Sequence, residues 1–180
     1  DRMGVLETKN GKIFTIAQWY PRMCVYDDVR GWNTNPYLGA SEFYLEYGEF
    51  DVSITAPANH IVVASGELLN PTAVYSTVEQ SRLAQAKQSD KTVFIRTAAE
   101  VENSSKILSA ATKTWNYKIK NARDFSWSSS AAFILDAAKI NLPSGKKSLA
   151  VSVYPVESAG DAAWGRSTEY TKASIENYSK

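Results

Sequence analysis

The stretch TKTWNYKIK, residues 112–120, alternates between polar and apolar side chains along its whole length. Trp115, Tyr117 and Ile119 fall on one side, and Asn116 and the lysines fall on the other. Because successive side chains of a strand point to opposite faces, this alternation predicts a β-strand buried on one face only. Together with the similar segments described next, this strand predicts a mainly β chain.

Other segments give the same signal. Residues 12–20 are rich in β-branched and aromatic side chains and follow Asn10-Gly11, a strong hairpin signal. Residues 43–47 and 51–56 each alternate, and we predict that they pair with each other around a turn at Gly48. Residues 60–67 would add a third strand. Later strands are predicted at 124–129, 133–140 and 149–154, with a turn at Pro143-Ser144-Gly145 between the last two.

Helices are predicted in three places. Ser76 with Glu79, and Thr97 with Glu100, have the spacing of capping boxes, so short helices are expected at 76–87 and 97–105, inserted into the β domain. From Asp161 onward the spacing becomes helical, with Asp161 as a possible cap. The stripe that carries this pattern is Trp164, Thr168, Thr171, Ile175 and Tyr178.

The predicted fold class is therefore mainly β, an antiparallel β-sandwich or saddle-like domain with short inserted helices and a C-terminal helix. We divide the chain at residue 157. Residues 1–157 are interpreted as a β-rich, non-catalytic N-terminal domain, and residues 158–180 as the first helix of a following domain against which the apolar stripe would be buried.

The charge balance argues against several classes of partner. The chain carries 20 basic and 19 acidic residues without a basic block, so no nucleic-acid or anionic-membrane footprint is expected. No apolar run approaches the ~20 residues that span a bilayer, so no membrane span is predicted. Cys24 is the only cysteine, which excludes an internal disulfide and leaves the compartment open. We favour the cell envelope, the periplasm or secretion.

The residues offer little catalytic chemistry. His60 is the single histidine, and without HExxH or more than one cysteine a standard zinc hydrolase site is not expected, so His60 is interpreted as structural. The serines at 126–130 lack a G-x-S-x-G elbow and read as an alternating strand. Paired carboxylates are interpreted as solvated; they are Asp27, Asp28, Glu42 and Glu46. We predict no catalytic residue and no metal in this chain.

Several motifs in order carry a resemblance. IAQWYPRM (16–23) and VYDDVRGW (25–32) come first, followed by FY (43–44), GEFDVSITAP (48–57), ASGEL (64–68) and ARDFSWSSS (122–130). This set resembles the N-terminal domain of aminopeptidase-N-type zinc metallopeptidases. These enzymes are gluzincins, a group that also includes leukotriene hydrolase, and the likeness is greatest to a bacterial, Bacteroidetes-like branch.

The resemblance implies a saddle-shaped domain that packs on a thermolysin-like catalytic domain. Zinc, held by HExxH and a distant glutamate, would lie in that missing catalytic domain after Lys180, and further strands would precede Asp1, so the chain would be truncated at its start. Gln18 matches the family position that holds the free amino end of the peptide substrate. Arg22 is expected to form an ion pair with Asp27 or Asp28 in the following loop.

Two alternatives stay open. The chain could be a non-enzymatic β-sandwich module for carbohydrate binding or adhesion, with Trp32, Tyr37 and Tyr44 as a flat sugar platform. It could also belong to a larger hydrolase whose catalytic motif has decayed. The substrate side-chain preference and the oligomeric state are not determined by these patterns.

Overall fold

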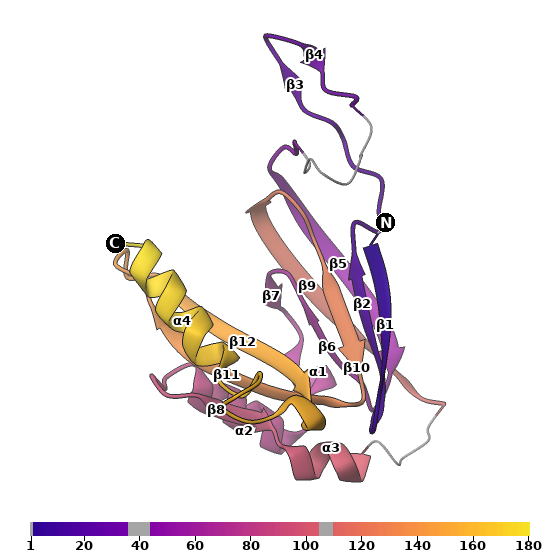
Figure 1. Ribbon diagram of the computed structural model, residues 1–180, viewed down its shortest axis with the longest axis vertical. Helices are drawn as coiled ribbons and strands as arrows, with labels where there is room; N and C mark the ends of the chain where they lie inside the picture. Colours follow the sequence, from indigo (N-terminus) through magenta and orange to yellow (C-terminus); the bar gives the residue numbers. More distant parts are fainter. Residues whose placement is uncertain (1, 36–43, 105–109) are drawn as a thin grey trace.

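The computed structural model describes residues 2–35, 44–104 and 110–180. The predicted fold class is confirmed: the chain is mainly β, with several antiparallel sheets, four α-helices that include a C-terminal one, and no closed barrel among the described residues. Figure 1 shows the sheets forming the body, with one small hairpin projecting from it.

The first sheet has four antiparallel strands in the order β1-β2-β10-β6. They are β1 (Arg2–Thr8), β2 (Gly11–Ala17), β10 (Trp127–Ser130) and β6 (Ile61–Ala64). The predicted hairpin is confirmed, since Thr8 pairs with Gly11 across a two-residue loop. Gly11 has a φ of +129°, a backbone conformation that only glycine adopts without strain.

The second sheet has the order β5-β9-β7. Its strands are β5 (Gly48–Pro57), β9 (Thr112–Ala122) and β7 (Glu67–Leu68). The strand predicted from residues 112–120 is confirmed, and its Trp115 and Tyr117 are buried. The pairing predicted for 43–47 with 51–56 is wrong, because β5 pairs with β9 and Gly48 begins the strand instead of turning the chain. Residue 43 lies outside the described residues. Alternation reveals which face of a strand is buried, not which strand lies beside it.

Gly66 divides the strand that was predicted at 60–67. Its φ is +92°, and a Cβ built there would lie 2.4 Å from the backbone oxygen of Lys118. The chain therefore bends at Gly66, so that β6 joins the first sheet while β7 joins the second. One predicted strand is in fact two, and the bend links the two sheets.

The third sheet has the order β12-β11-β8. Its strands are β8 (Val93–Arg96), β11 (Phe133–Asn141) and β12 (Lys147–Pro155). The turn between β11 and β12 is confirmed, with Gly145 at a φ of +73°. The strand β8 has only four residues and was not predicted from the sequence. The projecting hairpin consists of β3 (Tyr26–Asp27) and β4 (Gly31–Trp32).

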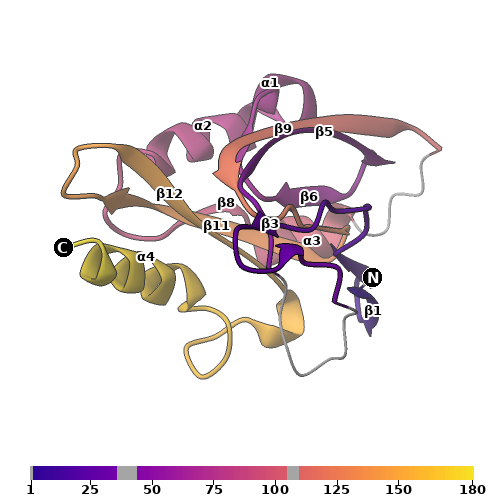
Figure 2. The ribbon, with the colours of Figure 1, turned by 90° about the horizontal axis from the view of Figure 1, so that it is seen from above.

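Helices cover both faces of the third sheet, namely α2 (Thr77–Ala86), α3 (Ala98–Ser104) and α4 (Ser167–Tyr178), whereas α1 (Pro71–Val74) packs on β9 of the second sheet. A 3-10 turn at Val156–Ser158 follows β12. Figure 2 shows α2 and α4 on opposite sides of the sheet that contains β11 and β12. The sheet thus buries side chains in both directions, and the core contains aliphatic and aromatic residues from all three sheets.

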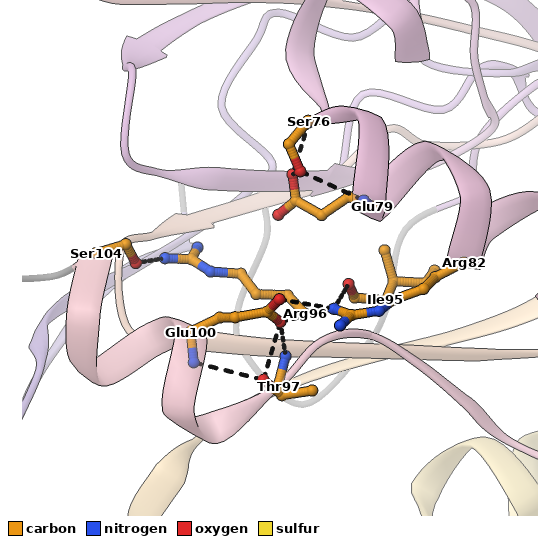
Figure 3. Close-up of polar contacts among 8 residues, drawn as sticks. All are labelled: Ser76, Glu79, Arg82, Ile95, Arg96, Thr97, Glu100 and Ser104. Atoms are coloured by element: carbon orange, nitrogen blue, oxygen red, sulfur yellow. Dashed lines mark hydrogen bonds and ion pairs between the residues drawn. The ribbon is translucent and has the colours of Figure 1, made fainter.

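Both predicted capping boxes are present. In α2 the backbone N–H of Ser76 donates to Glu79 at 2.7 Å, and Glu79 N–H donates back to the Ser76 hydroxyl at 3.3 Å. In α3 the Thr97 N–H donates to Glu100 at 2.8 Å. Arg82 of α2 then forms an ion pair with Glu100 at 2.7 Å, which ties the two helices together (Figure 3). The caps fix where each helix begins, and the ion pair fixes how α2 meets α3.

The C-terminal helix begins later than predicted. It starts at Ser167, and Arg166 rather than Asp161 occupies the position before the first turn, without a side-chain cap. Only Thr168 of the predicted stripe is fully buried, against β11 and β12, whereas Trp164 and Tyr178 are 62% and 91% exposed. That α4 opens a following domain stays a prediction.

Candidate functional site

Gln18 directly follows the last residue of β2. Its φ is +53°, so this non-glycine residue has a left-handed backbone that ends the strand and turns the chain outward. The side chain is half-buried, and it forms no hydrogen bond with another described residue. The amide of Gln18 is therefore available to a ligand.

The segment after Gln18 is fastened to the loop before β10. The indole N–H of Trp19 donates to the backbone oxygen of Phe125 at 3.1 Å. The Tyr20 hydroxyl donates to Oδ1 of Asp124 at 2.9 Å, and Arg22 donates to Oδ2 of the same carboxylate at 2.9 Å. Burial and the bond to Asp124 raise the pKa of Tyr20 to about 12. Three side-chain anchors between residues 19 and 22 thus hold the segment that follows Gln18.

The predicted ion pair of Arg22 with Asp27 or Asp28 is wrong. Arg22 instead pairs with Asp124, which lies more than one hundred positions away along the chain. Asp27 accepts the backbone N–H groups of Val29 and Arg30 at 3.0 and 2.7 Å. The latter bond, with a further one from a neighbouring asparagine amide, holds the Asp27 pKa below its usual range. Nearby N–H groups satisfy the Asp27 carboxylate, so Arg22 forms its ion pair with Asp124, which is distant in the sequence.

His60 lies at the start of β6 and contacts neighbouring strands. Its Nδ1 is 2.8 Å from the Ser129 hydroxyl, and its ring is stacked at 6.3 Å from the ring of Phe14. Burial and the nearby Arg96 charge lower the His60 pKa. These contacts agree with a structural role, which sequence spacing had already suggested.

The described residues do not fit a zinc site. Among residues 2–35, 44–104 and 110–180 there is no group of three or more His, Cys, Asp or Glu side chains close enough to share a metal ion. His60 already bonds Ser129 through one ring nitrogen, and Cys24 pairs only by a backbone bridge with Leu45. Zinc ligation usually takes three or four such side chains.

The remaining sequence candidates are scattered. Asp28 and Glu46 are exposed, and Glu42 and Tyr37 lie outside the described residues. Trp32 is 56% exposed on the projecting hairpin, where its ring packs edge-on against Tyr26 with centroids 5.1 Å apart. Tyr44 is also exposed. Among the described residues, Asp27, Asp28 and Glu46 belong to no group of three or more potential metal ligands.

A large groove with a volume of about 1320 Å³ opens between the first and third sheets, and Leu68 and Tyr117 of the second sheet also line it. We call it the inter-sheet groove and define it by six apolar lining residues: Ile16, Ala64, Trp127, Leu149, Val151 and Val153. The groove was not predicted from the sequence, because alternation marks apolar faces without showing that two of them are separated in space. The sequence feature that indicated one wall of the groove is the alternation of apolar residues at 149–153.

Comparison of the chain with protein-family models, with curated protein sequences and with solved structures found no match. No helix in the described part of the chain has both the length and the apolar character needed to cross a bilayer. The fold and the contacts around Gln18 are therefore the basis for a functional proposal.

Proposed function

We propose that this chain is the non-catalytic N-terminal portion of a zinc-dependent, aminopeptidase-like exopeptidase. In the intact protein it forms one wall of the substrate cleft, and Gln18 binds the free amino end of the peptide. The zinc ligands and the catalytic base belong to a catalytic domain outside these 180 residues. The proposal begins from the ordered motifs between residues 16 and 130.

The main support for the proposal is that the chain holds the backbone of Gln18 in place and leaves its side-chain amide without a hydrogen bond among the described residues. Its backbone is held in a left-handed conformation, while Trp19 and Tyr20 are bonded to the 124–125 loop. A residue held in a sparsely populated conformation costs about 1–3 kcal/mol and persists where its surroundings enforce it. The side-chain oxygen of Gln18 has the chemistry to accept a hydrogen bond from an ammonium group.

Holding the backbone of Gln18 before the substrate arrives reduces the entropy that binding must offset. A hydrogen bond to a charged group contributes about 1.5–3 kcal/mol. The contact would orient the peptide so that its first peptide bond faces the catalytic domain. The chain itself then contributes binding and orientation, and no chemical step.

The test uses the longer polypeptide that the same gene encodes. We expect it to contain zinc by elemental analysis and to release the first residue from peptides with a free amino end, but not from N-acetylated peptides. Gln18→Ala should lower kcat/KM by about 10- to 150-fold, which is the hydrogen-bond energy converted at 1.36 kcal/mol per tenfold change. Gln85→Ala, at an exposed position on α2, is the matched control and should change nothing.

Three results would count against the proposal. They are a longer polypeptide without zinc, one without exopeptidase activity, and equal kinetics for Gln18→Ala and Gln85→Ala. The last result would remove Gln18 from the cleft while leaving the class of enzyme intact.

A second candidate is a carbohydrate-binding or adhesion module. It is favoured by the exposed Trp32 on a hairpin that projects from the sheets (Figure 1). Tyr26 and Trp32 are both exposed, but the 73° between their ring planes means that the two rings do not form one flat platform. Binding to a glycan array that disappears in Trp32→Ala would support this candidate over the first.

A further inference from the structure

Polar side chains hold α4 against the third sheet. Thr168, Lys172 and Glu176 are spaced four residues apart, so they lie on one face of the helix, and Ser167 is the only other residue of α4 that is not exposed. The large apolar residues of the helix are exposed instead, namely Tyr170, Ile175 and Tyr178. A helix held by apolar burial shows the reverse pattern. The docking of α4 therefore depends on hydrogen bonds and ion pairs.

The first polar contact surrounds a buried carboxyl group. We call it the Thr168 contact and define it by Thr168 of α4, Asp136 of β11, and Ser152 and Tyr154 of β12. Oδ1 of Asp136 accepts the Thr168 hydroxyl and Oδ2 accepts the Tyr154 hydroxyl, both at 2.5 Å. The Ser152 hydroxyl lies 2.8 Å from that of Thr168. Because Asp136 is fully buried, detaching α4 removes one of its two hydroxyl donors and opens the carboxyl group to water.

No cation pairs with this carboxyl group in the described part of the chain. Phe94 of β8 is the strand partner of Asp136, and Val101 of α3 belongs to the apolar cluster around Tyr154. The charged side chains at the start of α4 and along it have other partners, and the pairs are Arg166 with Glu169, Lys172 with Glu176, and Lys172 with Asp90. The Asp136 carboxyl group thus faces hydroxyl groups and apolar side chains.

The second polar contact lies two turns further along the helix. We call it the Lys172 contact and define it by Lys172, Glu176, Asp90, Lys139 and Asn141. Nζ of Lys172 donates to Glu176 at 2.7 Å, to Asp90 at 3.3 Å and to the backbone oxygen of Lys139 at 2.8 Å. The side chain of Asn141 donates to Asp90 at 2.7 Å, and its backbone N–H donates to Glu176 at 2.6 Å. Nζ of Lys139 is 3.4 Å from Asp90. This contact joins carboxylates to cations, unlike the first.

The two contacts shift the pKa values of their carboxyl groups in opposite directions. Burial raises the pKa of Asp136 above its ordinary 3.8, although the bonds from Thr168 and Tyr154 oppose the rise. Hydrogen bonds from Asn141 and Lys172 hold the pKa of Asp90 below 3.8. Those from Lys172 and Asn141 hold the pKa of Glu176 below 4.5. Detaching α4 removes Lys172 and exposes Asp136, which returns these groups toward their ordinary values.

Docking consequently responds to pH in two ways. The Thr168 contact stabilises docking fully below pH 3.8, and this stabilisation is lost as the pH rises through the raised pKa of Asp136. The Lys172 contact stabilises docking fully above pH 4.5, and this stabilisation is lost as the pH falls through the lowered pKa values of Asp90 and Glu176.

We propose that α4 is a pH-sensitive switch, which detaches from the third sheet separately from the rest of the fold and docks most firmly in an acidic window between the responses of its two contacts. Detachment uncovers the face of β11 and β12 that carries Asp136 and Tyr154. This inference goes beyond the proposed function and does not depend on it.

Hydrogen exchange of the 180-residue chain between about pH 3.5 and 8 tests the proposal. The protection factor of each amide, corrected for the intrinsic pH dependence of exchange, reports the free energy of opening. We expect the amides of α4 to be less protected than those of β9, with a maximum of protection at acidic pH. Above the maximum, protection should fall by at most about tenfold per pH unit, because a single carboxyl group releases its proton.

Two variants separate the two contacts. Asp136→Asn keeps the shape of the side chain but cannot ionise, so the fall above the maximum should disappear while the fall below it remains. Lys172→Met removes the cation that binds Asp90 and Glu176, so the fall below the maximum should shrink while the fall above it remains. Lys146→Met, at an exposed position in the turn before β12, is the matched control and should keep both.

Three results would overturn the proposal. The first is equal protection of α4 and β9 at every pH, which would mean that the helix opens only with the whole fold. The second is protection of α4 that changes with pH no more than that of β9. The third is a fall above the maximum that persists in Asp136→Asn. The first two are measured on the unmodified chain, so they do not require a variant to fold.

Discussion

Replacing Thr168 with valine tests how the C-terminal helix is held on the sheet. The Thr168 hydroxyl donates to Oδ1 of Asp136 at 2.5 Å, and both side chains are buried. Oδ2 of Asp136 accepts the Tyr154 hydroxyl, also at 2.5 Å. Valine keeps the shape of threonine and removes only the hydroxyl, so the variant loses the bond to the buried carboxyl group together with the contact of the hydroxyl with Ser152 at 2.8 Å.

The magnitude follows from that geometry. A hydrogen bond to a charged group contributes about 1.5–3 kcal/mol, and in a domain of this size 1 kcal/mol shifts Tm by about 2–4 °C. Thr168→Val should therefore lower the free energy of unfolding by about 1.5–3 kcal/mol and Tm by about 3–12 °C. Thr171→Val, on the exposed side of the same helix, is the matched control.

The stability that Thr168→Val loses should depend on pH, and it should increase as the pH rises. Burial raises the Asp136 pKa above its ordinary 3.8, while the hydrogen bonds from Thr168 and Tyr154 oppose the rise. A carboxyl whose pKa is higher in the folded state contributes most to stability below 3.8, and this contribution is lost as the pH rises through the folded-state pKa. Because Thr168→Val raises that pKa further, its deficit should grow as the pH rises above 3.8 through this window.

Urea unfolding, followed by far-UV circular dichroism at several pH values, measures both effects. In an Asp136→Asn background the cost of Thr168→Val should shrink and lose its pH dependence, because no carboxyl remains to titrate. Equal stability of Thr168→Val and Thr171→Val, or a deficit that narrows as the pH rises, would refute the reasoning.

Three further predictions concern the elements that link the sheets and the helices. Gly66→Ala should destabilise the protein by more than about 2 kcal/mol in thermal unfolding, because the new Cβ would clash with backbone at a positive φ. Asp124→Asn should cost about 1–2 kcal/mol, because it breaks the part-buried ion pair with Arg22, and should speed hydrogen exchange around residue 18. Ser76→Ala should cost about 1 kcal/mol through loss of the N-cap, whereas Ser81→Ala within the same helix should be neutral.

Each of these has an outcome that would contradict it. Gly145→Ala shares a positive φ but has nothing within 4 Å of the new Cβ, so a cost equal to that of Gly66→Ala would show that crowding at Gly66 is unimportant. Unchanged exchange near residue 18 in Asp124→Asn would mean that the carboxylate does not fix the Gln18 segment. A larger loss for Ser81→Ala than for Ser76→Ala would remove the capping argument.

Local sequence patterns determined a good part of the fold. The alternation of Trp115 and Tyr117, the turn residues around Gly11 and Gly145, and the capping boxes at Ser76 and Thr97 each depend on neighbours within a few positions. Such features are fixed by side-chain period and backbone conformation, which the sequence displays directly. Gln18 was also singled out from sequence, through the motif around it.

Tertiary structure alone decided which elements meet. Nothing near Arg22 indicated Asp124 as its partner, and nothing in residues 48–57 indicated residues 112–122 as the paired strand. The burial of Asp136 beneath Thr168, and the separation of two apolar walls at Val151, depend equally on distant segments. The physical reason is that a pattern specifies which face seeks burial, whereas the covering segment is selected by packing over the whole chain.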